Sequence, residues 1–352
     1  MADLGELAQR FRDFAGTSTA RAPLYGRLSV GIAGEPELLT LLQVAPEPQQ
    51  IPVLLFAAVH DLVLGGAGTA LGRFYPNLTA HPADGDPFPA FREFCAAHRT
   101  ELTQLIASRN TQTNEVGRCA QFLPVLKMIG DEVGPLAHID VGASAGLNLL
   151  LPRYEFRYSP GGTVGGPSTV VLGCATRGPV PVPSDMPVIA TSVGLDVAPI
   201  DVRDDGEVRW LEACVWPDQA DRFARLVAAI TLAKANPPDV RRGDAVDDLP
   251  HLITQLAGLA HPVVTNSWVL NYLTAQQRVA YVHTLDEIGA QTDLSWVIAE
   301  SPAYTPELPV ATTSPPEDIT VLSLVTWRAG RRTVRRLGTT HPHGFWLHWE
   351  DH

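Results

Sequence analysis

Residues 136–148 read LAHIDVGASAGLN, and this stretch decides the fold because it joins three successive patterns. The apolar run at 136–142 predicts a short buried strand, the small residues after it predict a tight loop, and 147–151 predicts a helix. A strand, a glycine-containing loop and a helix in this order are typical of α/β proteins. The residues leave two functional interpretations of the loop open.

In the first interpretation the loop binds a nucleotide-type cofactor. Gly142 and Gly146 let the backbone approach a ligand closely, and the first helical turn, which includes Asn148, offers free N–H groups. Asp140, at the end of the strand, is placed to orient polar groups of the ligand. Ser144 stands where a GxGxG loop has its middle glycine, so the loop departs from that pattern at its centre.

In the second interpretation the same residues form the GxSxG nucleophile elbow of an α/β-hydrolase, and Ser144 is the nucleophile of an esterase. An acid and a histidine follow in the required order, as Asp293 or Glu300 and then His341 or His343. An elbow of this kind follows several strands, however, and the chain before residue 137 shows helical periodicity only. The context therefore favours the cofactor interpretation.

Strand and helix patterns alternate after the loop. Further strands are predicted at 187–196, near 240, at 262–268 and at 294–300, with helices at about 208–235, 249–256 and 274–288. This alternation predicts an α/β fold with a Rossmann-like, doubly wound, mostly parallel sheet. Two last strand patterns, at 319–327 and 333–338, predict a C-terminal antiparallel hairpin.

The patterns also divide the chain into parts. We expect a helical N-terminal cap subdomain at 1–136 and a Rossmann-like domain at 137–352. Residues 160–187 contain 12 glycines or prolines, which predicts a loop-rich insertion at about 152–187, with a hairpin near 169–174. We expect this insertion to lie over the functional site.

Polar residues recur at the carboxyl ends of the predicted strands. Asp196 ends the second strand, Asp244 and Ala245 follow the third, and Asn266 lies at the end of the fourth. Open parallel sheets bind ligands at these ends, where an acid can accept from ribose hydroxyls or from an adenine amine. An acid at a strand end also serves as a helix cap or a turn residue.

On these motifs the segment 137–349 resembles the class I S-adenosylmethionine-dependent methyltransferases. DVGASAG at 140–146 is similar to their first motif, GLDVAP at 194–199 to their second, GDA at 243–245 to their third and TNSW at 265–268 to their fourth. The terminal hairpin is similar to their reversed last strand pair. The resemblance implies S-adenosylmethionine as the cofactor, held by Asp140, Gly142, Ser144, Gly146, Asn148, Asp196, Asp244, Ala245 and Asn266.

Two features depart from that family's pattern. One is Ser144 in place of a glycine. The other is the gap of 50 residues between Gly146 and Asp196, where this kind of fold usually has about 20. The insertion must account for the gap, and Glu155 is the alternative ribose ligand.

The segment 109–118, RNTQTNEVGR, is dense in polar residues just before the first strand. We expect it to line a pocket mouth, although a solvated helix start also explains it. Glu115 and His283 are the candidate general bases of methyl transfer, and Asn266 is the third candidate catalytic residue. Arg118 and Trp268 are expected to contact the substrate.

The whole chain is also similar to a bacterial family of uncharacterised proteins. The similarity includes TQTNEVGRCA at 111–120 and WLEACVWPDQ at 210–219. It indicates a single inherited unit and implies no substrate.

Composition limits the classes of molecule that the protein is expected to bind. The net charge of −12 argues against nucleic-acid binding, so a small-molecule substrate is expected. The four cysteines are scattered without a CxxC pair, which is typical of a cytoplasmic protein without structural zinc. The most apolar run, at 51–64, is too short to span a membrane.

Two clusters near the C-terminus need interpretation. The first holds His341, His343, His348 and His352 without a clearly placed carboxylate, so no metal is expected. The second places five arginines at 328–336 and is interpreted as a solvated edge strand.

Three functions therefore remain open. The favoured one is S-adenosylmethionine-dependent methyl transfer to a small molecule. The alternatives are a hydrolase that uses Ser144 and a non-catalytic protein that binds a nucleotide-like ligand.

Overall fold

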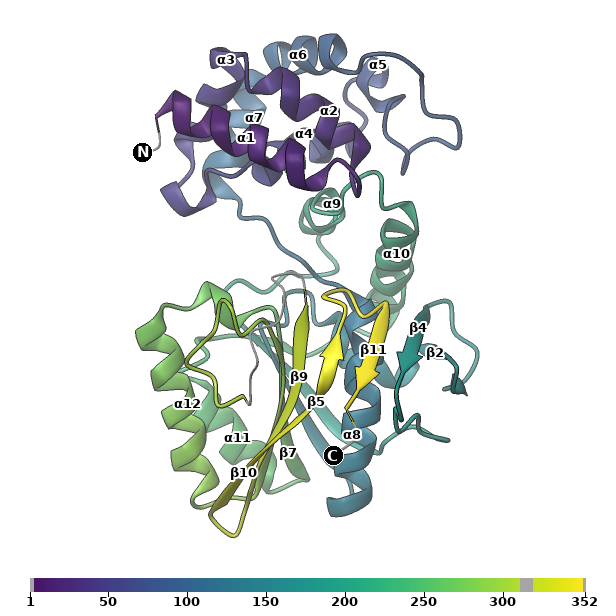
Figure 1. Ribbon diagram of the computed structural model, residues 1–352, viewed down its shortest axis with the longest axis vertical. Coiled ribbons are helices and arrows are strands. Elements are labelled where there is room, and N and C mark those ends of the chain that lie inside the picture. The colour runs from purple at the N-terminus through teal and green to yellow at the C-terminus, as the bar shows by residue number, and fades with distance from the viewer. Residues whose placement is uncertain (1–2, 311–318, 351–352) are drawn as a thin grey trace. The chain divides into compact units, whose positions relative to one another are not determined.

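The computed structural model (Figure 1) describes residues 3–310 and 319–350 of the 352-residue chain. The chain forms two compact units. Unit 1 comprises residues 1–113 and 202–227, and unit 2 comprises residues 114–201 and 228–352. The division into a cap at 1–136 and a domain at 137–352 stays a prediction.

The described part of unit 1 consists of helices and connecting loops. Its α-helices are α1 (Leu4–Ser18), α2 (Pro23–Ile32), α3 (Pro36–Leu39), α4 (Pro52–Leu64), α5 (Thr69–Gly72), α6 (Phe88–Ala97), α7 (Arg99–Ser108) and α9 (Asp205–Ala213). Local sequence explains where α1 begins, because Asp3 and Glu6 form a reciprocal capping box. The backbone N–H of Glu6 donates to Asp3 at 2.8 Å, and that of Asp3 donates to Glu6 at 3.1 Å.

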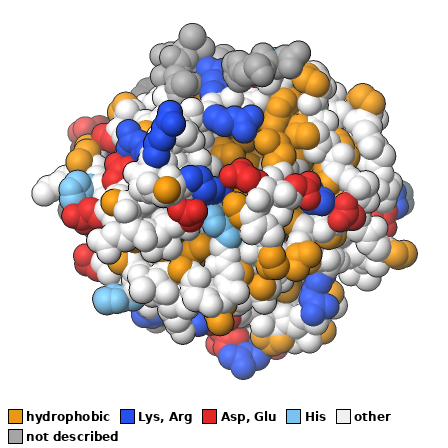
Figure 2. Space-filling view, turned by 90° about the horizontal axis from the view of Figure 1, so that it is seen from below, with side chains coloured by type: hydrophobic (Ala, Val, Ile, Leu, Met, Phe, Trp, Pro, Cys, Tyr) orange, Lys and Arg blue, Asp and Glu red, His pale blue; other side chains and the backbone are white. Residues whose placement is uncertain are grey.

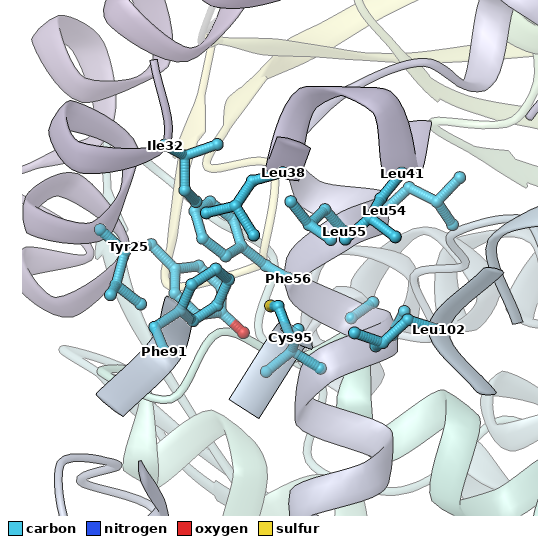
Figure 3. Packing of buried hydrophobic residues seen from close by; sticks show 14 of the residues in the cluster. Tyr25, Ile32, Leu38, Leu41, Leu54, Leu55, Phe56, Phe91, Cys95 and Leu102 are labelled. Atoms are coloured by element: carbon cyan, nitrogen blue, oxygen red, sulfur yellow. The ribbon is translucent and has the colours of Figure 1, made fainter. Parts of the chain in front are cut away.

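Helix α4 lies at the centre of the apolar core of unit 1 (Figure 3). Phe56 on α4 is fully buried and stacks on Tyr25 of α2, with 4.1 Å between ring centroids and 10° between ring planes. Phe11 of α1 and Phe91 of α6 meet the same ring edge-on. A helix that is apolar on all sides must be covered on all sides, so the apolar run at 51–64 forms the core of this unit.

One predicted helix is wrong in its extent. The segment 208–235 forms two helices, α9 and α10 (Ala220–Ala235), and α10 has residues in both units. Pro217 lies between them and cannot donate the backbone hydrogen bond that a continuous helix requires at that position.

Unit 2 is built on one 11-stranded mixed sheet, whose order is β3-β2-β4-β11-β10-β9-β8-β7-β1-β5-β6. The strands are β1 (Leu136–Val141), β2 (Glu155–Ser159), β3 (Gly162–Val164), β4 (Val171–Arg177), β5 (Ile189–Asp196), β6 (Val240–Arg242), β7 (His261–Ser267), β8 (Leu294–Glu300), β9 (Thr320–Arg328), β10 (Arg331–Thr340) and β11 (Trp346–Trp349).

The five strands from β6 to β8 are parallel throughout, with β1 at their centre. Strands β1, β7 and β8 are buried along nearly their whole length, which is typical of parallel strands covered on both faces. Strand β9 reverses direction against β8 and pairs with β10 around Ala329 and Gly330. The α/β fold with a mostly parallel mixed sheet is therefore confirmed.

The predicted insertion is wrong in its internal structure. Its residues form β2, β3 and β4, which extend the sheet beyond β11, in place of a loop-rich cover. The hairpin is β2–β3, around residues 160–161, and the segment 169–174 contributes instead to β4, which runs parallel to β2. Glycines and prolines mark the turns between these short strands, and periodicity alone could not show which strands pair.

Helices cover both faces of the parallel strands. On one face α11 (Leu249–Ala257) and α12 (Ala275–Gly289) pack against Ile139 and Val264. On the other face lies α8 (Cys119–Val133), whose Gln121 donates to Ser267 Oγ at 3.3 Å. Strand side chains alternate between faces, so Ser267 and Val264 point to opposite sides.

Candidate functional site

Asp140 is the buried centre of the candidate site. It is 2% exposed, near the carboxyl end of β1. Its Oδ1 accepts from Thr265 Oγ1 at 2.7 Å, and its Oδ2 accepts from Asn148 Nδ2 at 3.3 Å. Thr265 is its register partner on β7, which explains the short contact. Burial raises the pKa of Asp140 to about 6, although these hydrogen bonds and the Arg118 charge oppose the shift.

The hydrogen-bond chain continues past Thr265. His138 Nε2 lies 2.9 Å from Thr265 Oγ1. The threonine hydroxyl has one proton, so when it donates to Asp140 the imidazole must donate to it. Burial lowers the pKa of His138 to about 4, which keeps the ring neutral at pH 7. Asp140 is thus held by partners inside the protein.

The glycines of the loop after β1 are required by the backbone and by packing. Gly142 has φ +75° and Gly146 has φ +70°, in the left-handed region that favours glycine. A Cβ at Gly142 would lie 2.1 Å from Val269 Cγ2, and one at Gly146 would lie 2.5 Å from Val240 Cγ2. The side chains of Val269 and Val240 occupy the space beside these glycines, where the sequence interpretation placed a ligand. The glycines are therefore required by backbone conformation and packing, which corrects that interpretation.

A helix follows the loop at the predicted place, but it is a 3₁₀ helix. Residues Leu147–Arg153 form a short 3₁₀ helix, which begins after Gly146 and is followed by β2. Pro152 within this segment cannot extend a regular helical hydrogen-bond ladder. Asn148 therefore serves through its side chain on Asp140, and the segment offers no α-helical N-terminus to an anion.

Asp196 joins the loops that follow β1 and β5. Its Oδ2 accepts from the backbone N–H of Ser144 at 2.8 Å, and its Oδ1 accepts from that of Ala198 at 2.8 Å. The long gap in sequence does not separate it from β1, because the intervening strands extend the opposite side of the sheet. Glu155 lies there on β2, paired with Arg157, so the structure does not bring it to this loop.

Asp244 closes the turn that leads into α11. Its Oδ1 accepts from the backbone N–H of Val246 at 2.7 Å and of Asp247 at 3.3 Å. Ala245 packs against the core beneath α11 and α12. Asp244 is half-buried and is therefore a turn residue that still faces solvent in part.

Asn266 is a core residue, which departs from its predicted catalytic and cofactor roles. It is fully buried, and its Oδ1 accepts from Tyr281 OH at 2.8 Å and from Trp296 Nε1 at 2.6 Å. These partners face α12 and the apolar core. Side chains alternate between the two faces along β7, so Asn266 points to the face covered by α12. Thr265 and Ser267, the polar residues on either side of it, point to the other face.

The segment before α8 reaches the carboxyl ends of β1 and β7, and its role at a pocket mouth stays a prediction. Asn114 Nδ2 donates to Ala143 O in the loop after β1 at 3.2 Å. Arg118 is 7% exposed and donates to Ser267 O at 2.8 Å. Glu115 is 3% exposed, and its Oε2 lies 3.7 Å from His343 Nδ1. The structure thus brings Glu115 and Arg118 to the site.

Of the other two predicted residues, Trp268 lies at the carboxyl edge of the sheet and His283 lies on the surface. Trp268 follows β7 with φ +54°, and its Nε1 donates to Thr320 Oγ1 at 2.5 Å. Its ring lies 6.3 Å from that of Tyr304, at the same edge of the sheet. His283 lies on α12, where its side chain is 70% exposed and pairs with Glu287 at 3.5 Å. His283 is therefore a surface residue in this structure.

Glu300, the last residue of β8, completes the site. It is 2% exposed, and its Oε1 accepts from the backbone N–H of Val269 at 3.0 Å and of Leu270 at 3.2 Å. Burial raises its pKa to about 7, although those bonds and the Arg118 charge oppose the shift. The sequence signal for Glu300 was an acid at the end of a mostly apolar strand. From the sequence alone, Glu300 is a candidate only as the triad acid of the hydrolase interpretation.

The arginine cluster at 328–336 is largely paired. Arg328 pairs with Glu132, Arg332 with Asp286, and Arg336 with Glu350. Figure 2, viewed from the side of the β9–β10 turn, shows acidic and basic side chains intermixed. Among the described residues, strand β11 pairs only with residues 338–340 of β10, so the arginine-bearing part at 331–336 pairs with β9 alone and is an exposed edge, as predicted.

The C-terminal histidines do not form a metal site in the described part of the chain. His343 lies beside Glu115, His348 is exposed on β11, and His352 lies outside the described residues. Within residues 3–310 and 319–350, no group of three or more His, Cys, Asp or Glu side chains is placed to hold a metal ion. Over the same residues, each helix is too short or too polar to cross a bilayer.

Comparison with known proteins gives one family. Residues 8–349 match the model of DUF2332, described as an uncharacterized protein conserved in bacteria. The search of curated proteins finds no match.

Proposed function

We propose that this chain, which belongs to the DUF2332 family, transfers a methyl group from S-adenosylmethionine to a small-molecule substrate. The observation that carries the proposal is the hydrogen bond that connects the loops after β1 and β5, in which the backbone N–H of Ser144 donates to Asp196. This hydrogen bond places the half-buried Asp196 carboxylate against the glycine-containing loop, at the carboxyl edge of the parallel strands. That edge is where open α/β sheets bind nucleotide-like ligands.

Strand order supports the same proposal. Taken in chain order, the parallel strands β1, β5, β6, β7 and β8 are arranged 3-2-1-4-5, which is the order of a Rossmann-like, doubly wound sheet. The order reverses between β1 and β7. Asp140 and Thr265 are paired across this reversal, so the buried polar centre coincides with the expected ligand crevice.

The donor and acceptor groups fit an adenosyl ligand in part. Asp196 and Asp244 are half-buried, and each carboxylate keeps acceptor capacity beyond the backbone bonds described above. Asp196 can accept from ribose hydroxyls, and Asp244 from an exocyclic amine. Asp140 and the two glycines serve the protein interior, so they support the loop without contacting the ligand.

S-adenosylmethionine would supply a methyl group bound to a positively charged sulfur. The chain's own contribution is to position the substrate, to exclude water and to accept a proton. Arg118 and Trp268 lie at the carboxyl edge, where they can contact the substrate. Glu115 is the candidate base because it is buried in the same segment as Arg118, whereas His283 is exposed on α12.

Asp244→Ala is expected to weaken the binding of S-adenosylhomocysteine at least tenfold, because it removes the acceptor for the adenine amine. Isothermal titration with S-adenosylmethionine and S-adenosylhomocysteine measures this. Asp247→Ala is the matched control, since Asp247 is an exposed acid of the same turn. Binding of neither compound by the wild-type protein at millimolar concentration would contradict the proposal.

One observation favours the hydrolase as a second candidate. Ser144 has φ +52°, and a nucleophile elbow holds its serine in a strained turn of this kind. The following 3₁₀ helix departs from the helix that such an elbow requires. Labelling of the wild type by a fluorophosphonate probe, lost in Ser144→Ala, together with no cofactor binding, would establish the hydrolase. Ligand binding without turnover would instead indicate the non-catalytic alternative.

A further inference from the structure

Glu300 holds the turn that follows β7. Its Oε1 accepts from two successive backbone N–H groups, those of Val269 and Leu270. The residue just before them, Trp268, has φ +54°, in the left-handed region that is strained for a non-glycine residue. Such a conformation persists only where its surroundings impose it. The Glu300 carboxylate holds the two residues that follow Trp268. Trp268 itself donates from its backbone to Ala299 O at 3.3 Å and from its ring to Thr320.

The same turn packs on the loop after β1. Val269 fills the space beside Gly142, where a Cβ would lie 2.1 Å from Val269 Cγ2. The position of Val269 therefore sets how closely the turn approaches the glycine-containing loop. Glu300 bonds the Val269 backbone from β8, the neighbouring strand. A change at Glu300 would be transmitted through Val269 to Gly142.

The second oxygen of Glu300 has a different environment from the first. Oε2 is buried and has no hydrogen-bond partner among the described residues. The charged and titratable groups that interact with this carboxyl are Arg118 before α8 and Tyr281 on α12. Arg118 is the cation among them, and its two described bonds go to backbone carbonyls of Ser267 and Pro342.

We propose that Glu300 is a positioning residue, which sets the Trp268–Leu270 turn and, through Val269, the loop at Gly142. The inference rests on the proposed function only in taking that loop as part of the cofactor site. Burial raises the pKa of Glu300 to about 7, so its charge changes near neutral pH. Because this pKa lies above that of a solvent-exposed glutamate, the closed turn binds the proton more tightly than an opened turn does, so the turn loosens as pH rises through about 7.

Amide hydrogen exchange of the full-length protein tests this without any ligand. In the wild type, after correction for intrinsic exchange, protection of the Val269 and Leu270 amides should fall about fivefold as pH rises from 5.5 to 8.5. Glu300→Gln should make protection independent of pH, because its amide oxygen accepts at every pH. Glu300→Ala should remove the protection throughout. Glu132→Gln, an exposed acid paired with Arg328, is the matched control and should follow the wild type.

Equal pH profiles in the wild type and Glu300→Gln would overturn the inference, and this comparison stands even where Glu300→Ala does not fold. The affinity for S-adenosylhomocysteine gives a second reading. It should fall about tenfold in Glu300→Ala and be restored to within about threefold of the wild type in Glu300→Gln. Absence of binding by every variant would contradict the proposed function, while the exchange profile would still decide the role of Glu300.

Discussion

Gly142→Ala is expected to lower the melting temperature of the protein by about 10 °C. Alanine at φ +75° costs about 1–2 kcal/mol, and the added Cβ would lie 2.1 Å from Val269 Cγ2. Forcing a methyl group into a packed core costs a further 1–3 kcal/mol or so. A total of about 3 kcal/mol corresponds to roughly 10 °C for a unit of this size. Thermal unfolding followed by circular dichroism measures the shift.

The two costs at Gly142 can be separated. Gly142→Ala combined with Val269→Ala should lose less than the sum of the single changes, because the smaller side chain relieves the contact. Gly258→Ala is the matched control, since nothing lies within 4 Å of its Cβ position and its φ is −74°. It should leave the melting temperature unchanged or raise it slightly. A Gly142→Ala protein as stable as this control would show that the loop is not held against Val269.

Asp140→Asn is expected to stabilise the protein at pH 8 by about 3 kcal/mol relative to the wild type. Burial raises the folded-state pKa of Asp140 from 3.8 to about 6, so the folded state binds the proton more tightly than the unfolded state. The stability contributed by this group is fully present below pH 3.8 and is lost as pH rises through about 6. Asparagine keeps an acceptor for Thr265 and carries no charge.

Denaturant unfolding across pH 4–8 measures this difference. The wild-type unfolding free energy should fall with rising pH more steeply than that of Asp140→Asn, and Glu300 should add a fall in the same direction up to about pH 7. Asp131→Asn, which changes an exposed acid of α8, should follow the wild-type curve. Parallel curves for the wild type and Asp140→Asn would show that Asp140 is ionised at little cost in the folded state.

The local pattern was sufficient for the strands that are buried on both faces. The residues of β8 are apolar from Trp296 to Ala299, just before Glu300, and the strand has the predicted bounds. Helix α12 begins where Thr274 and Gln277 form a capping box, within one residue of the prediction. Both features depend on neighbours in sequence, and for that reason they could be predicted without the tertiary structure.

The site was predictable only in outline. Asp140, Ser144 and Asp196 meet at the carboxyl ends of adjacent strands, as their positions in the motif indicated. Asn266 carries the same kind of side chain at the same kind of position, yet it faces the core. Asn266 and Thr265 are neighbours on β7, and side chains of neighbouring strand residues point to opposite faces of the sheet. Only Thr265 therefore contacts Asp140.

The sequence by itself determined the α/β class, the parallel strands and the edge at which polar residues gather, because these follow from periodicity and from residues adjacent in the chain. Only the tertiary structure decided that the insertion extends the sheet through β11, that Val269 fills the space at Gly142, and that Glu300 holds the turn after β7. These relations join segments far apart in sequence. Their energies come from packing and from burial of charge, which no local pattern records.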